Sequence, residues 1–308
     1  MSPSPRVLAL SGGVGGAKLV DGLARVLPAE ALTVVVNTGD DLRHWGLWIS
    51  PDVDTVMHTL AGIADEVLGW GRQGESHRVL EGVRRYGGDD WFRLGDLDLA
   101  THLVRTEALA RGERLTEVTG RLCRAWNIGP RVLPMADTPR PTWIDTEEDG
   151  TLPFQEWFVR RRAAPRVRAV RYGGEGRLTP EVAAALAEAD LVLFGPSNPY
   201  VSIGPILAVP GLRERLVGKR VVAVSPIVGG RAVKGPLAEM FHALTGREAS
   251  AREMAALYGD LLSGMIVEHG DGWSDGPPAC GEAATVMGDG PDRARLAARV
   301  LEFAAALG

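Results

Sequence analysis

RVLALSGGVGGAKL at 6–19 and LTVVVNTGDD at 32–41 are the two stretches that decide the fold of this sequence. Residues 6–10 and 32–37 are apolar runs typical of buried strands, and the spacing between them predicts a helix that starts near Ala17 and ends before Pro28. A strand, a helix and a second strand within about 35 residues form a βαβ unit, whose two strands run parallel in one sheet. The sequence therefore predicts an α/β protein with a mostly parallel sheet.

The same alternation of strands and helices returns in the second half of the chain. Helical spacing covers 181–189, strand-like runs cover 191–194 and 220–225, and loops follow them at 195–199 and 226–236. Residues 127–180 are irregular and contain several prolines, which predicts an inserted subdomain with short antiparallel strands. We therefore expect one domain over 1–308, with a core of about 1–126 and 181–308 and helices on both faces of its sheet.

Three further helices are expected between these halves. Ser50-Pro51-Asp52 is typical of a helix start, because serine can cap, proline suits the first turn and aspartate complements the helix dipole. The other two helices are expected at 98–111 and 115–126. The apolar residues predicted to face the core from the first of these helices are Val53, Val56, Met57, Leu60, Ile63, Ala64 and Val67.

Bulk composition bounds the class of protein. The chain has 308 residues, of which 45% are apolar, and no apolar run approaches the roughly 20 residues that cross a bilayer. A net charge of −5 argues against nucleic acid as the main partner, because phosphate backbones require a basic face. Only two cysteines are present, without metal-type spacing, and no secretion signal opens the chain, so a cytoplasmic location is expected.

The glycine-rich turn after the first strand is the candidate phosphate site. Glycines at such a turn let backbone N–H groups approach an anion at the start of a helix. The turn is not a Walker A loop, and it lacks the third glycine of the dinucleotide fingerprint. The alternative is a tight structural turn without a ligand. The candidate phosphate-binding residues are Gly12, Gly13, Val14, Gly15, Gly16 and Lys18.

Four aspartates follow the second strand or open the next helix. Asp40 and Asp41 lie in the turn after that strand, and Asp52 and Asp54 lie in the first turn of the helix. Ligands collect at the carboxyl ends of parallel strands, and Mg²⁺ is often bound by one or two carboxylates together with substrate phosphates. The alternative interpretation assigns Asp52 to the helix dipole and the pair after the strand to turn formation.

Several other loops carry side chains of interest. His44, Trp45 and Trp48 could stack on a flat heterocycle, or they could pack beneath their own loop. Ser197 and Asn198, in the loop after a later strand, could contact a nucleotide, although two flanking prolines also make this loop a rigid turn.

Taken in order, these segments resemble the 2-phospho-L-lactate transferase family of coenzyme F420 biosynthesis. The resemblance covers nearly the whole chain except 270–308, and one departure is Leu97, which replaces the usual basic residue of an LGDRD segment. The segments that carry the resemblance are SGGVGGAKL (11–19), LTVVVNTGDD (32–41), ISPDVDTVMHTLAG (49–62), GWGR (69–72), RLGDLDLATHLVR (93–105), FQEWFV (154–159), GPSNPYVSIGPIL (195–207) and AVSPIVGGRAVKGP (223–236).

The resemblance implies a Rossmann-like fold with an additional subdomain, a homodimer and a defined reaction. A lactyl- or enolpyruvyl-diphosphoguanosine donor would be attacked at phosphorus by the terminal ribityl hydroxyl of the deazaflavin Fo, releasing GMP. It further implies that Asp54 and Arg93 contact Fo and that Asp40 is associated with Mg²⁺. From these positions we predict Asp40 and Asp54 as catalytic and Mg²⁺-binding residues, with Asp54 as candidate general base.

Two other classes of protein are alternatives to this transferase. A non-catalytic nucleotide-sugar-binding regulator of the gluconeogenesis-factor type shares the glycine turn, but it typically carries a DDGGSSG-like segment where this chain has Asp40-Asp41-Leu42-Arg43-His44. A nicotinamide dehydrogenase is disfavoured by the missing third glycine and by Asn37 at the end of the second strand. The residues leave open which three-carbon acid the donor carries.

Overall fold

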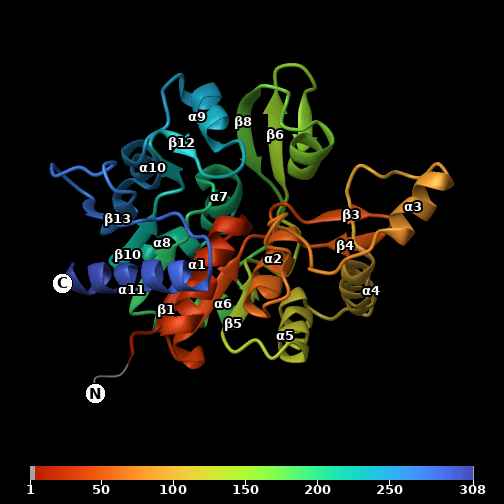
Figure 1. Ribbon diagram of the computed structural model, residues 1–308, viewed down its shortest axis with the longest axis horizontal. Coiled ribbons are helices and arrows are strands. Elements are labelled where there is room, and N and C mark those ends of the chain that lie inside the picture. Colours follow the sequence, from red (N-terminus) through yellow and green to blue (C-terminus); the bar gives the residue numbers. More distant parts are fainter. Residues whose placement is uncertain (1–3, 308) are drawn as a thin grey trace.

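The computed structural model describes residues 4–307, and a seven-stranded sheet forms its centre (Figure 1). In order across the sheet, the strands are β14 (Ala279–Glu282), β13 (Gly264–Val267), β10 (Val221–Val224), β9 (Leu191–Phe194), β1 (Val7–Ser11), β2 (Leu32–Val36) and β5 (Arg131–Pro134). All neighbouring pairs run parallel. β1 pairs with β2 on one side and with β9 on the other, so both halves of the chain build the sheet, as predicted.

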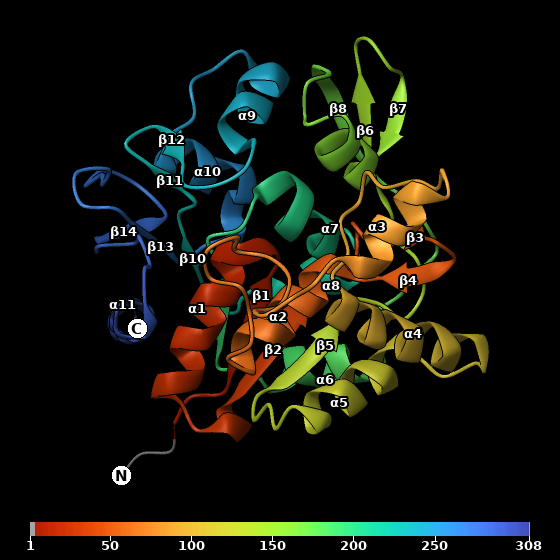
Figure 2. The same cartoon turned by 45° about the vertical axis from the view of Figure 1, so that its right-hand side comes forward.

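Successive residues of the central strands supply two separate cores, because side chains alternate between the faces of a sheet. Val7 and Ala9 of β1 belong to one core, and Leu8 and Leu10 belong to the other. Figure 2 shows helices on both sides of the sheet. One core includes side chains of α1 (Gly13–Val26), α2 (Pro51–Leu60), α5 (Leu115–Ala125) and α11 (Gly290–Ala306). The other includes side chains of α6 (Pro180–Glu188), α7 (Gly204–Leu207), α8 (Leu212–Leu216), α9 (Leu237–Thr245) and α10 (Ala251–Tyr258).

Smaller elements surround the carboxyl ends of the strands. The stretch 127–180 contains a three-stranded antiparallel sheet, as expected, but it also contains β5, which belongs to the main sheet because β5 pairs with β2. These elements are β3 (Leu42–His44), β4 (Leu47–Ile49), α3 (Arg78–Arg85), α4 (Asp96–Ala110), β6 (Thr142–Thr146), β7 (Thr151–Pro153), β8 (Val167–Tyr172), β11 (Ile227–Val228) and β12 (Arg231–Ala232). Short turns of helix are η1 (Ala29–Ala31), η2 (Glu156–Arg160), η3 (Pro199–Ile203) and η4 (Gly259–Leu261).

Two predicted helix boundaries were wrong. α1 begins at Gly13 instead of near Ala17, so most of the glycine turn forms the first turn of the helix. α2 ends at Leu60, because Gly62 adopts a φ of 68°, in the left-handed region that favours glycine. Val67, expected to face the core, is therefore 96% exposed. Within residues 4–307, no helix combines the length and apolar character needed to span a bilayer.

Candidate active site

A single pocket of about 810 Å³ lies over the carboxyl ends of the strands. Its lining includes the glycine turn, the loops after β9 and β10, the start of α2, and residues of α4. This is the edge where parallel sheets bind ligands, at the point where connections leave β1 and β9 toward opposite sides of the sheet. The predicted site residues that line it are Gly12, Gly13, Val14, Gly15, Lys18, Asp40, Asp54, Arg93, Ser197 and Asn198.

The glycine turn is held in place by the loop that follows β9. The Ser197 hydroxyl donates to the carbonyl of Gly12 at 2.7 Å and accepts from its N–H at 3.3 Å. Asn198 instead caps the next helical turn, where its side-chain oxygen accepts the N–H of Tyr200 at 2.8 Å. A Cβ on Gly15 would come within 2.5 Å of the carbonyl oxygen of Pro196, so the two loops touch only because a glycine stands there. These contacts shape the start of α1 at the pocket.

Asn37, at the end of β2, joins two of the aspartates. Its side-chain amide donates to Asp40 Oδ1 at 3.1 Å, to Asp52 Oδ2 at 2.8 Å and to the carbonyl of Val201 at 3.2 Å. Asp52 Oδ1 accepts the N–H of Gly13 at 2.7 Å, which links this pair to the glycine turn. Sequence reasoning missed the role of Asn37, because its partners lie 3, 15 and 164 residues along the chain and only the fold brings all three to one amide.

Asp40 and Asp52 form a buried pair of like charges. Burial, followed by repulsion from Asp52, raises the pKa of Asp40 well above its usual range, although Gln155 donates to it at 3.0 Å. Burial also raises the pKa of Asp52 to about 6, despite its hydrogen bonds from Asn37 and Gly13. Two buried carboxylates that share one neutral donor are stabilised by a nearby cation. Among residues 4–307, no group of three or more His, Cys, Asp or Glu side chains is arranged to hold a metal, so any cation here would take its remaining ligands from water or substrate.

Asp54 lies in a different environment from the one predicted. Both of its carboxylate oxygens accept from the guanidinium of Arg105, and His102 Nδ1 lies 3.7 Å from Asp54 Oδ2. Burial acts to raise the pKa of Asp54, but Arg105 and His102 outweigh it and hold this pKa below its usual value. A low pKa disfavours the predicted role of general base. The structure brings Asp40 together with Asp52, and it pairs Asp54 with Arg105.

Aromatic side chains line part of the same pocket. Trp70, Trp91, Phe92 and Phe158 line it, together with Arg93, whose guanidinium lies 5.9 Å from the ring centroid of Trp70. These rings offer apolar faces to a flat ligand. The sequence signals for these rings were Trp70 within GWGR (69–72) and Trp91, which lies two residues before Arg93.

Two interpretations were open for the rings between the two pairs of aspartates, stacking on a ligand or packing beneath their own loop. His44 contacts Trp45, Trp91 and Phe92, while the indole of Trp48 donates to Asp41 at 2.9 Å. His44, Trp45 and Trp48 therefore pack within the β3–β4 hairpin and its surroundings, which is the alternative that the sequence left open.

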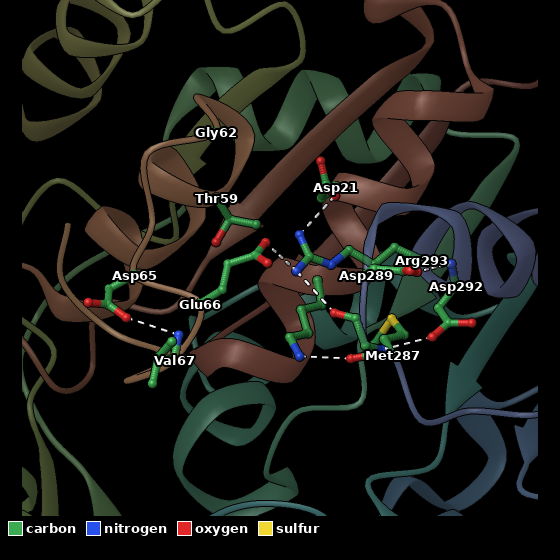
Figure 3. A network of polar contacts seen from close by, with 12 residues as sticks. Asp21, Thr59, Gly62, Asp65, Glu66, Val67, Met287, Asp289, Asp292 and Arg293 are labelled. Atoms are coloured by element: carbon green, nitrogen blue, oxygen red, sulfur yellow. Dashed lines mark hydrogen bonds and ion pairs between the residues drawn. The ribbon is translucent and has the colours of Figure 1, made fainter. Parts of the chain in front are cut away.

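One wall of the pocket is a loop at residues 64–71, called here the 64–71 strap. An isolated antiparallel bridge between Ala64 and Arg72 closes its base. Glu66 accepts from Arg293 at 2.7 Å, and Arg293 also donates to Asp21 of α1 at 3.1 Å (Figure 3). On the other side, Lys234 donates to the carbonyl of Leu68 at 3.3 Å. Remote segments of the chain thus hold the strap over the pocket.

Lys18 stands beside this strap on α1. Its ammonium group donates to the carbonyl of Met287 at 2.7 Å. Burial, followed by the positive charge of Arg293, lowers its pKa. Lys234 also lines the pocket, so cationic side chains gather at this end, next to the glycine turn. This arrangement suits an anionic ligand that spans from the turn toward the strap.

Comparison with known proteins finds a matching family and similar sequences. A family model described as 2-phospho-L-lactate transferase CofD matches residues 7–273. A protein from Kitasatospora aureofaciens named phosphoenolpyruvate transferase is 47% identical over 276 residues, which cover 86% of each chain. A protein from Methanosarcina mazei named 2-phospho-L-lactate transferase is 40% identical over 267 residues, covering 86% of this chain and 88% of that one.

A solved structure shares the fold. The crystal structure of a UPF0052-family protein from Bacillus halodurans superposes with a TM-score of 0.65 at 15% sequence identity, and the match covers 97% of this chain and 100% of that chain. This likeness supports the predicted α/β architecture.

Proposed function

This chain belongs to the 2-phospho-L-lactate transferase CofD family and is a transferase of coenzyme F420 biosynthesis, and we propose that its acceptor is the deazaflavin Fo. The donor in this proposal is a three-carbon acid linked through a diphosphate to guanosine. The oxygen of the terminal ribityl hydroxyl bonds to the phosphorus that bears the acid, and the bond from that phosphorus to the bridging oxygen breaks. GMP leaves, and the hydroxyl proton is lost.

The observation that carries the proposal is the continuity of the pocket. One cavity of about 810 Å³ joins the glycine turn, the Asp40–Asp52 pair and the half lined by aromatic rings. A diphosphate suits the first end, because the start of α1 attracts anions and Lys18 lines the pocket there. A flat ring with a polar tail suits the other end. The two reactants would then meet beside the two aspartates.

In this proposal, Asp40 and Asp52 would hold a Mg²⁺ ion, which when bound would neutralise charge on the diphosphate. The support for this assignment is their mutual burial and their raised pKa values, which a cation would relieve. Asp54 is assigned a different role from the predicted one. Because its oxygens accept from Arg105, it serves as a fixed negative group that orients the acceptor.

The protein itself contributes mainly position and shape. Gly12 and Gly13 bring backbone against the diphosphate, and Lys18 adds positive charge at that end. Arg93, over the ring of Trp70, lies in the half assigned to the acceptor. Phosphoryl chemistry of this kind requires little covalent participation by the protein.

We further propose that the donor carries an enolpyruvyl group. The support is that relatives at 44–47% identity are named phosphoenolpyruvate transferases, whereas relatives at 40% identity carry either that name or the name 2-phospho-L-lactate transferase. The homodimer stays a prediction, which light scattering of the purified protein would check.

The decisive experiment offers Fo together with each candidate donor and identifies the product by mass spectrometry. We expect the dehydro form of F420-0 and GMP in equal amounts, with a dependence on Mg²⁺ that chelation removes. Formation of no product from Fo with any of the donors would refute the transfer reaction. Product formation that persists after complete chelation would refute the proposed Mg²⁺ site alone.

A further inference from the structure

Two buried polar side chains in the lining of the pocket have polar atoms without partners. His58 of α2 is 2% exposed, and neither of its ring nitrogens has a hydrogen-bond partner among residues 4–307. Asp98 of α4 is 7% exposed, and its Oδ1 is likewise without a partner. Both residues line the pocket. Buried polar groups in folded proteins are almost always paired, so such a combination at a pocket wall indicates a missing ligand group.

The geometry of this pair is informative. His58 Nε2 lies 3.9 Å from Asp98 Oδ1, which is too far for a hydrogen bond between them. Neighbouring atoms of one ligand edge can contact both. Burial lowers the pKa of His58 to about 4, so its neutral ring offers one N–H donor. Asp98 therefore offers a hydrogen-bond acceptor next to the N–H donor of His58.

Their surroundings restrict what can reach them. The rings of Trp126 and His58 make an edge contact, with centroids 5.2 Å apart. Asp54 and Arg105, already bonded to each other, lie close enough to affect the pKa of both residues. The rings of Trp91 and Phe92 line the same pocket and favour a planar ligand. A planar ring whose polar edge presents an N–H beside a carbonyl satisfies all of these groups.

We propose that His58 and Asp98 recognise the imide edge of the acceptor ring, and that they are specificity-determining residues of this enzyme. This inference rests on the proposed function, because a deazaflavin ring carries such an edge, an N–H between two carbonyls. Asp98 accepts the imide N–H, and His58 donates to an adjacent carbonyl. Neither residue takes part in the transfer of the phosphorus group.

The test compares Fo with an analogue methylated on the imide nitrogen, using quenching of ligand fluorescence to measure Kd. Wild-type protein is expected to bind the analogue at least about tenfold more weakly, the loss typical of one hydrogen bond with a charged group. His58→Leu and Asp98→Ala are expected to bind Fo about tenfold more weakly, with the donor KM unchanged. In Asp98→Ala the penalty of methylation falls below about threefold, since its protein partner is gone.

Two further variants separate recognition from structure. His58→Gln retains a donor and is expected to restore Fo binding to within about threefold of wild type. Thr119→Val is the matched control, because Thr119 is fully buried on α5 and has an unpartnered hydroxyl but does not line the pocket. This control is expected to leave both Kd values unchanged.

The outcomes distinguish this inference from the proposed function. Wild-type protein that fails to bind or convert Fo refutes the proposed function. Wild-type protein that converts Fo but binds the methylated analogue equally well overturns the inference alone, since an ordered water between the two residues would give this result. Undiminished discrimination in Asp98→Ala also overturns it. If a variant is insoluble, the comparison of the two ligands on wild-type protein still decides.

Discussion

Replacing Arg105 by methionine tests the buried ion pair beneath the pocket. Arg105 is completely buried and Asp54 is 6% exposed, so the carboxylate would lose its charged partner in a site that water barely reaches. Breaking a buried ion pair by removing one partner typically costs about 3–5 kcal/mol, because the remaining charge is uncompensated. Methionine fills much of the same volume, so loss of packing adds little.

The expected change in melting temperature follows from the length of the chain. With an unfolding entropy of about 2.1 cal/mol/K per residue, a loss of about 3–5 kcal/mol over 308 residues lowers Tm by about 5–8 °C. Differential scanning calorimetry measures this shift directly. Arg105 does not line the pocket whereas Asp54 does, so turnover should fall through the altered carboxylate. Its pKa should rise once the guanidinium is gone.

A double-mutant cycle supplies the control. Asp54→Asn removes the charge that Arg105→Met leaves behind, so the double variant should be less destabilised than the two single variants added together, by at least about 2 kcal/mol. Strict additivity, or a Tm for Arg105→Met within about 1 °C of wild type, would refute the view that the pair is mutually required.

Three other predictions concern the aspartates and the glycine turn. Asp40→Asn and Asp52→Asn should each lower kcat/KM at least about 100-fold, because an assisting cation stabilises the transition state by several kcal/mol. Each should also abolish any rise of Tm with Mg²⁺, and a variant that keeps this rise contradicts the assignment. Burial raises the pKa of Asp98 to about 7 from 3.8, so the folded state holds this proton more tightly than the unfolded chain, and stability falls by about 3 kcal/mol as pH rises from 5 to 8. Asp98→Asn should flatten that dependence in thermal scans, and an unchanged slope speaks against it. Gly12→Ala would place Cβ 2.6 Å from Asp52 Oδ2 and 2.7 Å from Ser202 Cβ. The free energy of unfolding should therefore fall by about 1–3 kcal/mol, and both Tm and donor affinity should drop. A wild-type Tm in calorimetry would show that the turn accommodates the extra methyl group.

The main sheet was predictable because its signal is local. Residues of β1, β2, β9 and β10 form apolar runs, and turn residues follow each of them. The apolar pattern and the turn residues therefore indicate the same strand ends. The convergence of Asp40 and Asp54 with the glycine turn was also predictable, since parallel strands bring their carboxyl ends to one edge. These positions follow from topology and require no knowledge of side-chain packing.

The partners of individual side chains were not predictable. Arg105 lies on a helix whose sequence does not reveal which face is buried, and its bond with Asp54 depends on how α4 packs against α2. Asn37 appeared only as a residue ending a strand. Val67 continues the helical spacing of α2, yet the helix ends earlier, at Leu60. The spacing of apolar residues does not reveal that Gly62 adopts a positive φ.

The clasp between Arg293 and Asp21 joins the last helix of the protein to the first. During synthesis, α11 can dock on α1 and hold the 64–71 strap through Glu66 only after the residues up to Ala306 have been made. A chain cut before α11 would carry every aspartate of the site, but its 64–71 strap would lose the ion pair of Glu66 and keep only the contact from Lys234 and the bridge at its base.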